Sequence, residues 1–106
     1  MSDDNWRPLG PASALREGDV VAFELDGREI AVYWTDDGLY ATDNRCTHGD
    51  ARLSDGFLLD HTIECPLHQG QFDVRNGAPM CDPVTVPIRC WRVRIEGEQV
   101  EVQPAD

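Results

Sequence analysis

Two short segments of this chain each combine a cysteine with a histidine, and this pairing constrains the fold more than any other feature. The first segment reads Cys46-Thr47-His48-Gly49, and the second reads Cys65-Pro66-Leu67-His68-Gln69-Gly70. Residues 49–64 separate the two ligand pairs, which suits a strand-and-turn excursion that brings two loops face to face. We therefore predict one metal centre with two thiolates and two imidazoles, supplied by Cys46, His48, Cys65 and His68.

A structural zinc site with two cysteines and two histidines is the first alternative for these ligands. Zinc modules usually place Cys with Cys and His with His in closely spaced pairs. Here each pair is mixed, and the flanking sequences Cys-Thr-His and Cys-Pro-Leu-His are not typical of zinc fingers. The pattern favours a different metal centre, and structural zinc stays as the alternative.

The rest of the chain carries short β-rich runs separated by turn signals. Residues 20–25 and 28–34 flank Asp26-Gly27, a two-residue hairpin signal. Residues 91–96 and 99–102 alternate apolar with polar side chains, as strands with one buried face do. From about residue 43 to 87 the sequence is rich in Gly, Pro, Asp and Asn and contains all of the Cys–His chemistry.

These runs predict an all-β protein. At 106 residues the chain has the length of one domain, so we predict a single domain over residues 1–106. We expect an antiparallel β-sandwich or barrel as the scaffold, with a loop-rich subdomain inserted at about residues 43–87. Loops on a rigid β framework are where binding sites are usually built.

At its Cys–His segments the chain resembles the Rieske [2Fe–2S] family. It is especially similar to the soluble ferredoxins of bacterial aromatic-ring hydroxylating dioxygenases of the naphthalene or biphenyl type. Residues 46–49 and 65–74 match the two cluster-binding boxes, and the likeness extends through residues 39–44, 53–56 and 81–84. The resemblance implies the Rieske fold, with the inserted subdomain binding one [2Fe–2S] cluster per chain.

The resemblance also implies a role for each ligand. Cys46 and Cys65 would hold the buried iron, and His48 and His68 would hold the outer iron, where electrons leave. Two ferric ions, two sulfides and two thiolates sum to a neutral core, whereas four thiolates would make the oxidised core −2. A cluster with two imidazole ligands therefore accepts an electron more easily than one with four thiolates.

The residues after the second ligand histidine affect the reduction potential of the cluster. High-potential Rieske proteins resemble one another in placing Ser two residues and Tyr four residues after that histidine, where the hydroxyls donate to cluster and cysteine sulfurs. Here these offsets fall on Gly70 and Phe72, which have no hydroxyl group. The resemblance therefore predicts a low-potential cluster.

The remaining cysteines and the third histidine fall outside the predicted ligand set. Rieske proteins of respiratory complexes carry one additional cysteine in each box, and the corresponding positions here are Ala51 and Leu67. We predict that Cys81 and Cys90 are free thiols, with a bridge between them as the alternative. We interpret His61 as a surface residue in a turn.

The composition of the chain limits the classes of partner that it can bind. The net charge is −11, from twenty acidic and nine basic residues, which argues against binding to nucleic acid or an anionic membrane. We find no run of about 18 apolar residues, as a membrane span requires, and no export signal near the N-terminus. We therefore expect a cytoplasmic protein without membrane attachment, and a monomer.

The function that the resemblance implies is one-electron transfer. A flavin-containing, NAD(P)H-linked reductase would supply the electron, and the terminal oxygenase of an aromatic-hydrocarbon catabolic system would receive it. The chain shows no two-His, one-carboxylate iron site and stops at Asp106, so we expect an electron-transfer component and not an enzyme. The small Rieske-like subunit of an assimilatory nitrite reductase is the alternative, besides structural zinc.

The same resemblance predicts where partner proteins dock. We expect the docking surface to surround His48 and His68, and to include Asp50, Leu67, Gln69 and Pro83.

Overall fold

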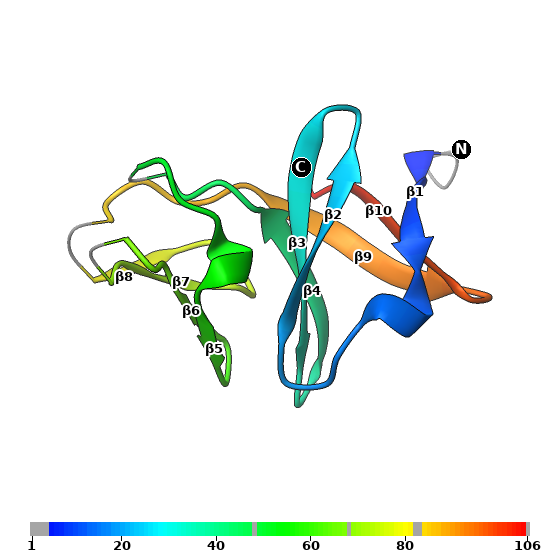
Figure 1. Ribbon diagram of the computed structural model, residues 1–106, viewed down its shortest axis with the longest axis horizontal. Helices are drawn as coiled ribbons and strands as arrows, with labels where there is room; N and C mark the ends of the chain where they lie inside the picture. The colour runs from blue at the N-terminus through cyan, green and yellow to red at the C-terminus, as the bar shows by residue number, and fades with distance from the viewer. Residues whose placement is uncertain (1–4, 48, 68, 82–83, 106) are drawn as a thin grey trace.

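The computed structural model describes residues 5–47, 49–67, 69–81 and 84–105, and strands dominate these ranges (Figure 1). The larger sheet is antiparallel, with strand order β1-β10-β9-β4-β3-β2. Its strands are β1 (Arg7–Pro11), β2 (Val20–Leu25), β3 (Arg28–Thr35), β4 (Gly38–Asp43), β9 (Cys90–Glu96) and β10 (Gln99–Pro104). The edge strands β1 and β2 also contact each other, because Gly10 lies against the ring of Phe23, and this nearly closes the sheet into a barrel.

A smaller antiparallel sheet lies beside the barrel, on the left in Figure 1. Its strands, in order, are β5 (Phe57–Leu59), β6 (Thr62–Glu64), β7 (Gln71–Asp73) and β8 (Pro79–Cys81). Two short 3₁₀ turns complete the described elements: η2 (Ala12–Ala14) and η3 (Leu53–Asp55). No helix in the ranges described is long and apolar enough to cross a membrane.

The predicted hairpin is confirmed. Val20 pairs with Tyr33 and Leu25 pairs with Arg28, so β2 and β3 align over their whole length. Asp26 and Gly27 have φ values of +52° and +86°, the positive values that a tight two-residue turn between twisted strands requires. The local turn chemistry therefore fixes the register of this hairpin.

Two groups of buried side chains form the core. One fills the barrel, and its fully buried members are Ile30, Val32, Val100 and Val102. The other lies between the barrel and the small sheet, and its members include Tyr33, Cys46, Leu53, Ile63, Cys65 and Phe72. Both predicted cysteine ligands therefore belong to the core that joins the two sheets.

The all-β prediction is confirmed, and the inserted region is more regular than the sequence indicated. Four strands of three residues each lie between residues 57 and 81, where we expected mainly loops. A three-residue strand is too short for apolar and polar residues to alternate recognisably. The prediction that His61 is a surface residue in a turn is confirmed, and the structure adds that its side chain, about a quarter exposed, contacts Asp37.

Candidate metal centre

The first predicted ligand, Cys46, lies in a loop that leaves the barrel after β4. Its backbone N–H donates to the carbonyl of Ala51 at 2.9 Å, and Arg45 pairs with Arg52 in an isolated antiparallel bridge. The loop therefore folds back on itself around the cysteine. Only 3% of Cys46 is exposed.

The second predicted ligand, Cys65, follows directly after β6 and is fully buried. Its backbone N–H donates to the carbonyl of Gly70 at 2.6 Å, which closes the segment 65–70 into a tight turn. Inside this turn the N–H of Leu67 donates to Cys65 Sγ, at an N–S distance of 3.4 Å. An N–H group directed at a cysteine sulfur stabilises negative charge on that sulfur.

The structure brings these two cysteines into one buried cluster of side chains, although eighteen residues separate them in the chain. Burial raises the pKa of the Cys65 thiol, and the neighbouring Cys46 raises it further. Two thiolates cannot share an apolar pocket unless positive charge offsets them. A bound metal centre supplies that charge, so the donor set and its surroundings fit a thiolate-ligated iron centre.

The predicted histidine ligands, His48 and His68, lie outside the described residues, as does Pro83 of the predicted docking surface. Among the residues that the structure does describe, no three potential ligand side chains converge on a common point. The described part of the chain thus contains half of the predicted ligand set, the cysteine pair.

Close packing between loops explains the two glycines of the ligand segments. A Cβ atom at Gly49 would lie 2.7 Å from Cδ2 of Leu67, which belongs to the other ligand loop. A Cβ atom at Gly70 would lie 2.6 Å from Cγ1 of Val84. Both distances are too short for a side chain without displacement of the neighbour. Gly49 therefore allows the two ligand loops to pack against each other, and Gly70 allows the second ligand loop to pack against the segment that contains Val84.

The third loop is the segment that leads from β8 toward β9. The hydroxyl group of Thr47 donates to the carbonyl of Val86 at 2.8 Å, which ties the first ligand loop to this segment. Val84 and Ile88 are buried in the same core as the cysteines. The described part of the segment therefore supports both ligand loops.

Asn44 holds the base of the first ligand loop, a role that the sequence did not reveal. Its side chain is buried, donates to Glu29 and Ser54 at 3.1 and 3.0 Å, and accepts the Ser54 N–H at 2.8 Å. Arg52 donates to both carboxylate oxygens of Glu29, at 2.8 and 2.9 Å. These bonds fix residues 44 and 52–54 against β3. A buried asparagine before a ligand segment is the signal that could have identified this role.

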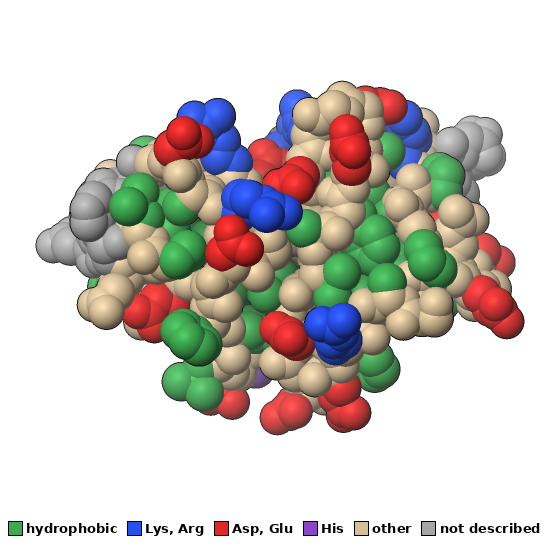
Figure 2. All heavy atoms as spheres, viewed as in Figure 1, with side chains coloured by type: hydrophobic (Ala, Val, Ile, Leu, Met, Phe, Trp, Pro, Cys, Tyr) green, Lys and Arg blue, Asp and Glu red, His purple; other side chains and the backbone are tan. Residues whose placement is uncertain are grey.

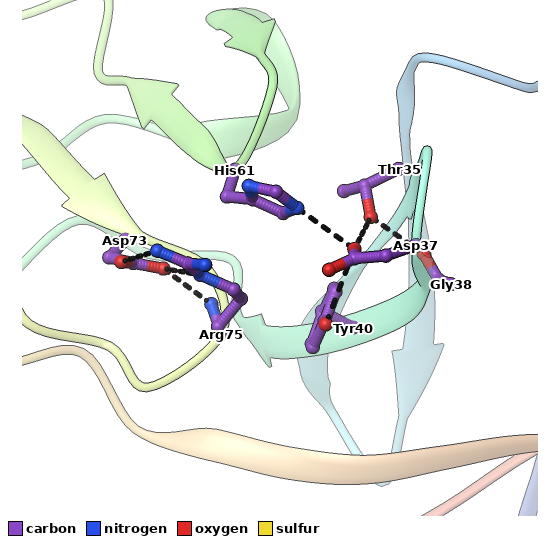
Figure 3. A network of polar contacts seen from close by, with 7 residues as sticks. All are labelled: Thr35, Asp37, Gly38, Tyr40, His61, Asp73 and Arg75. Atoms are coloured by element: carbon purple, nitrogen blue, oxygen red, sulfur yellow. Dashed lines mark hydrogen bonds and ion pairs between the residues drawn. The ribbon is translucent and has the colours of Figure 1, made fainter.

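A polar network joins the small sheet to the barrel (Figure 3). His61, in the β5–β6 turn, places Nε2 2.8 Å from Asp37 Oδ1, in the β3–β4 turn. The Thr35 hydroxyl donates to the same carboxylate at 2.8 Å, and this bond contributes most to the lowered pKa of Asp37. The ring of Tyr40 meets the His61 ring edge to face, at a centroid distance of 6.3 Å.

The remaining predictions near the centre concern Ala51, Leu67 and the other two cysteines. Ala51 and Leu67, the positions where the resemblance would place additional cysteines, both pack against the core that contains Cys46 and Cys65. Cys81 is exposed, Cys90 is half-buried, and both are free thiols, as predicted. Burial raises the pKa of the Cys90 thiol.

Comparison with known proteins identifies the family. The Rieske [2Fe-2S] domain matches residues 5–92 of this chain. The chain belongs to the Rieske [2Fe–2S] family. The members of this family are defined by their iron–sulfur cluster, so this Rieske protein carries one [2Fe–2S] cluster per chain.

Proteins that are similar in sequence along most of their length include ferredoxin components of dioxygenase systems. The chain is 54% identical over 99 residues to the ferredoxin component of a naphthalene 1,2-dioxygenase system from Pseudomonas aeruginosa, covering 93% of this chain and 95% of that protein. It is 58% identical over 97 residues to the ferredoxin component of a 2,4-dinitrotoluene dioxygenase system from Burkholderia sp. (strain RASC), covering 92% and 93%. Both alignments span nearly the whole of each protein.

Solved structures agree with this assignment. A ferredoxin of Sphingomonas yanoikuyae B1 matches with a TM-score of 0.86 and 37% identity, over 93% of this chain and 98% of that chain. The ferredoxin-like chain in a complex of reduced oxygenase and oxidised ferredoxin of carbazole 1,9a-dioxygenase matches with a TM-score of 0.83 and 37% identity, over 93% of both chains. The prediction of a Rieske fold is therefore confirmed.

Proposed function

We propose that this Rieske protein is the ferredoxin component of a multicomponent aromatic-ring hydroxylating system. It accepts one electron at a time from an NAD(P)H-dependent flavin reductase and passes each electron to the terminal oxygenase. The observation that carries the proposal is similarity to ferredoxin components along almost the whole chain. The match to a ferredoxin in complex with its oxygenase supports the second partner.

We propose Cys46, His48, Cys65 and His68 as the cluster ligands. The buried cysteine pair and the Cys-x-His and Cys-x-x-His spacings support this set. When bound, a [2Fe–2S] cluster with this ligand set stores and releases a single electron.

The residues around the cysteines prepare the site for a change of charge. The Leu67 N–H donates to Cys65 Sγ and favours the more negative, reduced state. The core side chains of Leu53, Ile63 and Phe72 exclude water from the buried side of the site. Because the loops are fixed by packing and backbone hydrogen bonds, little structure needs to rearrange when an electron arrives or leaves.

Similar proteins are named as ferredoxin components of dioxygenase systems, so this Rieske protein is an electron-transfer component and not an enzyme. We also propose that both sheets belong to one domain, residues 1–106, because the core containing the cysteines lies between them. We place the protein in the cytoplasm, where nicotinamide coenzymes supply electrons and thiols such as Cys81 and Cys90 stay reduced.

Reconstitution tests this function. The purified protein is mixed with a naphthalene-type reductase and terminal oxygenase, NADH and an aromatic substrate, and product formation is followed. We expect turnover that depends on this protein and disappears when it is omitted. Absence of turnover together with co-purification of a large sirohaem protein would instead support the nitrite reductase subunit.

A further inference from the structure

Two large apolar side chains project from the edge of the small sheet into solvent. Phe57 is 78% exposed and Leu59 is 73% exposed. Both belong to β5, the edge strand of this sheet, and residues at i and i+2 of a strand project from the same face. They therefore form one apolar ridge.

The ridge borders an open hollow of about 490 Å³, lined by Phe57, Leu58, Leu59, Asp60, Thr62, Glu64 and Gln71. Among these described lining residues, the charged side chains are Asp60 and Glu64, and none is Lys or Arg. Figure 2 shows hydrophobic side chains at the lower end of the β5–β6 hairpin, with acidic side chains beside them. The surface thus combines an apolar centre with an acidic rim.

Strand pairing places one end of this surface next to the start of the second ligand loop. Phe57 pairs with Glu64 in the ladder between β5 and β6, and Glu64 immediately precedes Cys65. The ridge therefore begins beside the second ligand loop and runs along the flank of the small sheet.

Exposed edge strands usually carry lysine, proline or another feature that discourages pairing with a second chain. Here β5 carries two apolar side chains instead, and adjacent exposed apolar side chains on a small monomer mark interaction sites. A second copy of this chain is a poor occupant, because each copy has a net charge of −11 and acidic groups on this rim. A partner with basic groups around an apolar centre complements the surface.

We infer that the ridge of Phe57 and Leu59, with its rim of Asp60 and Glu64, is a flank docking surface for a redox partner. That partner presents an apolar contact surrounded by lysine or arginine. This inference rests on the proposed function and extends the docking area from the ligand loops onto the side of the small sheet. The apolar centre holds the complex together, and the acidic rim guides its formation.

A double substitution tests the apolar centre. We expect Phe57→Ser with Leu59→Ser to raise the apparent KM for the ferredoxin about tenfold in reductase-driven reduction, in oxygenase-driven oxidation, or in both. The maximal rate and the electron paramagnetic resonance (EPR) spectrum of the cluster stay unchanged, which shows that the variant is folded and loaded. The matched control is Ile95→Ser on β9, an apolar residue that is 46% exposed in the barrel and should leave both KM values unchanged.

A second substitution tests the acidic rim. We expect Asp60→Asn with Glu64→Gln to weaken the salt dependence of the affected KM, because the partner's basic groups lose their counterparts. The control is Glu96→Gln with Glu98→Gln, which removes two negative charges at the β9–β10 turn. An equal effect of both charge pairs would show that only net charge matters, which would contradict a localised surface.

The outcomes separate this inference from the proposed function. If the wild-type protein exchanges electrons with both partners and the Phe57/Leu59 variant has unchanged KM values, the inference is wrong and the function stands. If the wild-type protein exchanges electrons with neither partner, both are wrong. A wild-type dimer in sedimentation velocity that the Phe57/Leu59 variant dissociates would assign the ridge to a second copy and overturn the inference.

Discussion

The Nε2 atom of His61 lies 2.8 Å from Oδ1 of Asp37, and this contact links the turn of the small sheet to a turn of the barrel. We expect His61→Ala to loosen the small sheet selectively. Amide hydrogen exchange should become faster at Val74, whose N–H donates to the carbonyl of His61, while Val32 in the barrel stays protected.

The global effect of this change should be small, because a polar contact between partly exposed surface groups contributes less than about 1 kcal/mol. The matched control is Arg7→Ala, which removes the exposed Arg7–Asp26 pair in the barrel. Equal acceleration in both sheets would show that the His61–Asp37 contact does not act locally.

Acid should destabilise the protein through three carboxylates whose pKa values are lowered in the folded state. The Arg52 guanidinium lowers the pKa of Glu29, the Thr35 hydroxyl lowers that of Asp37, and Arg75 lowers that of Asp73. The unfolded chain therefore binds protons first as the pH falls. Their stabilisation is fully present above about pH 5 and decreases as the pH falls below about 4 and through the lowered values.

Urea unfolding between about pH 3 and pH 6 measures this effect. We expect Asp73→Asn to reduce the free energy of unfolding near neutral pH. We also expect the free energy of unfolding of this variant to fall less steeply in acid, because one titrating group is removed. The control, Asp26→Asn, changes an exposed carboxylate in the β2–β3 turn. If the free energy of unfolding falls as steeply in acid for Asp73→Asn as for the wild-type protein, this assignment is wrong.

Asn44 supports the first ligand loop with three side-chain hydrogen bonds. Asn44→Ala leaves the partly buried Ser54 N–H without its acceptor, so we expect a loss of about 1–3 kcal/mol in the free energy of unfolding. We also expect faster loss of iron, measured by bleaching of the visible absorbance in the presence of a chelator. Asn5→Ala, at an exposed position, is the control and should change neither quantity. Normal iron retention in Asn44→Ala would show that the loop does not depend on this side chain.

Much of the barrel follows from local sequence signals. Asp26-Gly27 is compatible with positive φ at both positions, so the β2–β3 hairpin was predictable with its register. The alternating residues of β9 and β10 place Val100 and Val102 inside the barrel, as the pattern indicated. The ligand spacing indicated that two loops meet, and the cysteines of these loops, Cys46 and Cys65, lie in one buried cluster of side chains.

Long-range contacts were less predictable. The strands β5–β8 are too short to produce a pattern, and they form because neighbouring strands pair and Ile63 and Phe72 are buried. The contact between His61 and Asp37 joins two turns that are 24 residues apart. The bonds of Asn44 likewise connect a strand end with Glu29 and Ser54. No local pattern in the sequence specifies which distant residues meet in this way.

The residues after the second ligand histidine, Gly70 and Phe72, predict a low midpoint potential, toward the roughly −150 mV end of the Rieske range. Phe72 is fully buried in the core with the cysteines. If Phe72→Tyr adds a hydroxyl that donates to a cysteine sulfur with about 1.4 kcal/mol preference for the reduced state, the midpoint rises by roughly 59 mV. Protein-film voltammetry measures this shift, and Phe23→Tyr on β2 is the control.

The companion change, Gly70→Ser, meets a steric obstacle, because its Cβ would lie 2.6 Å from Val84 Cγ1. We therefore expect it to need Val84→Ala for normal cluster loading. With both hydroxyls present, the midpoint should rise by on the order of 100 mV. A fully loaded Phe72→Tyr variant with an unchanged midpoint would show that the hydroxyl does not reach a sulfur.

The central claim is that the cluster is held by two cysteines and two histidines, and EPR spectroscopy of the reduced protein tests it most directly. We expect the low average g-value typical of imidazole ligation, its loss in His48→Ala and in His68→Ala, and its retention in His61→Ala. Chemical analysis of the same wild-type sample should find about two irons and two acid-labile sulfides per chain. A colourless protein that contains one zinc, or a signal that survives both His48→Ala and His68→Ala, would contradict the account.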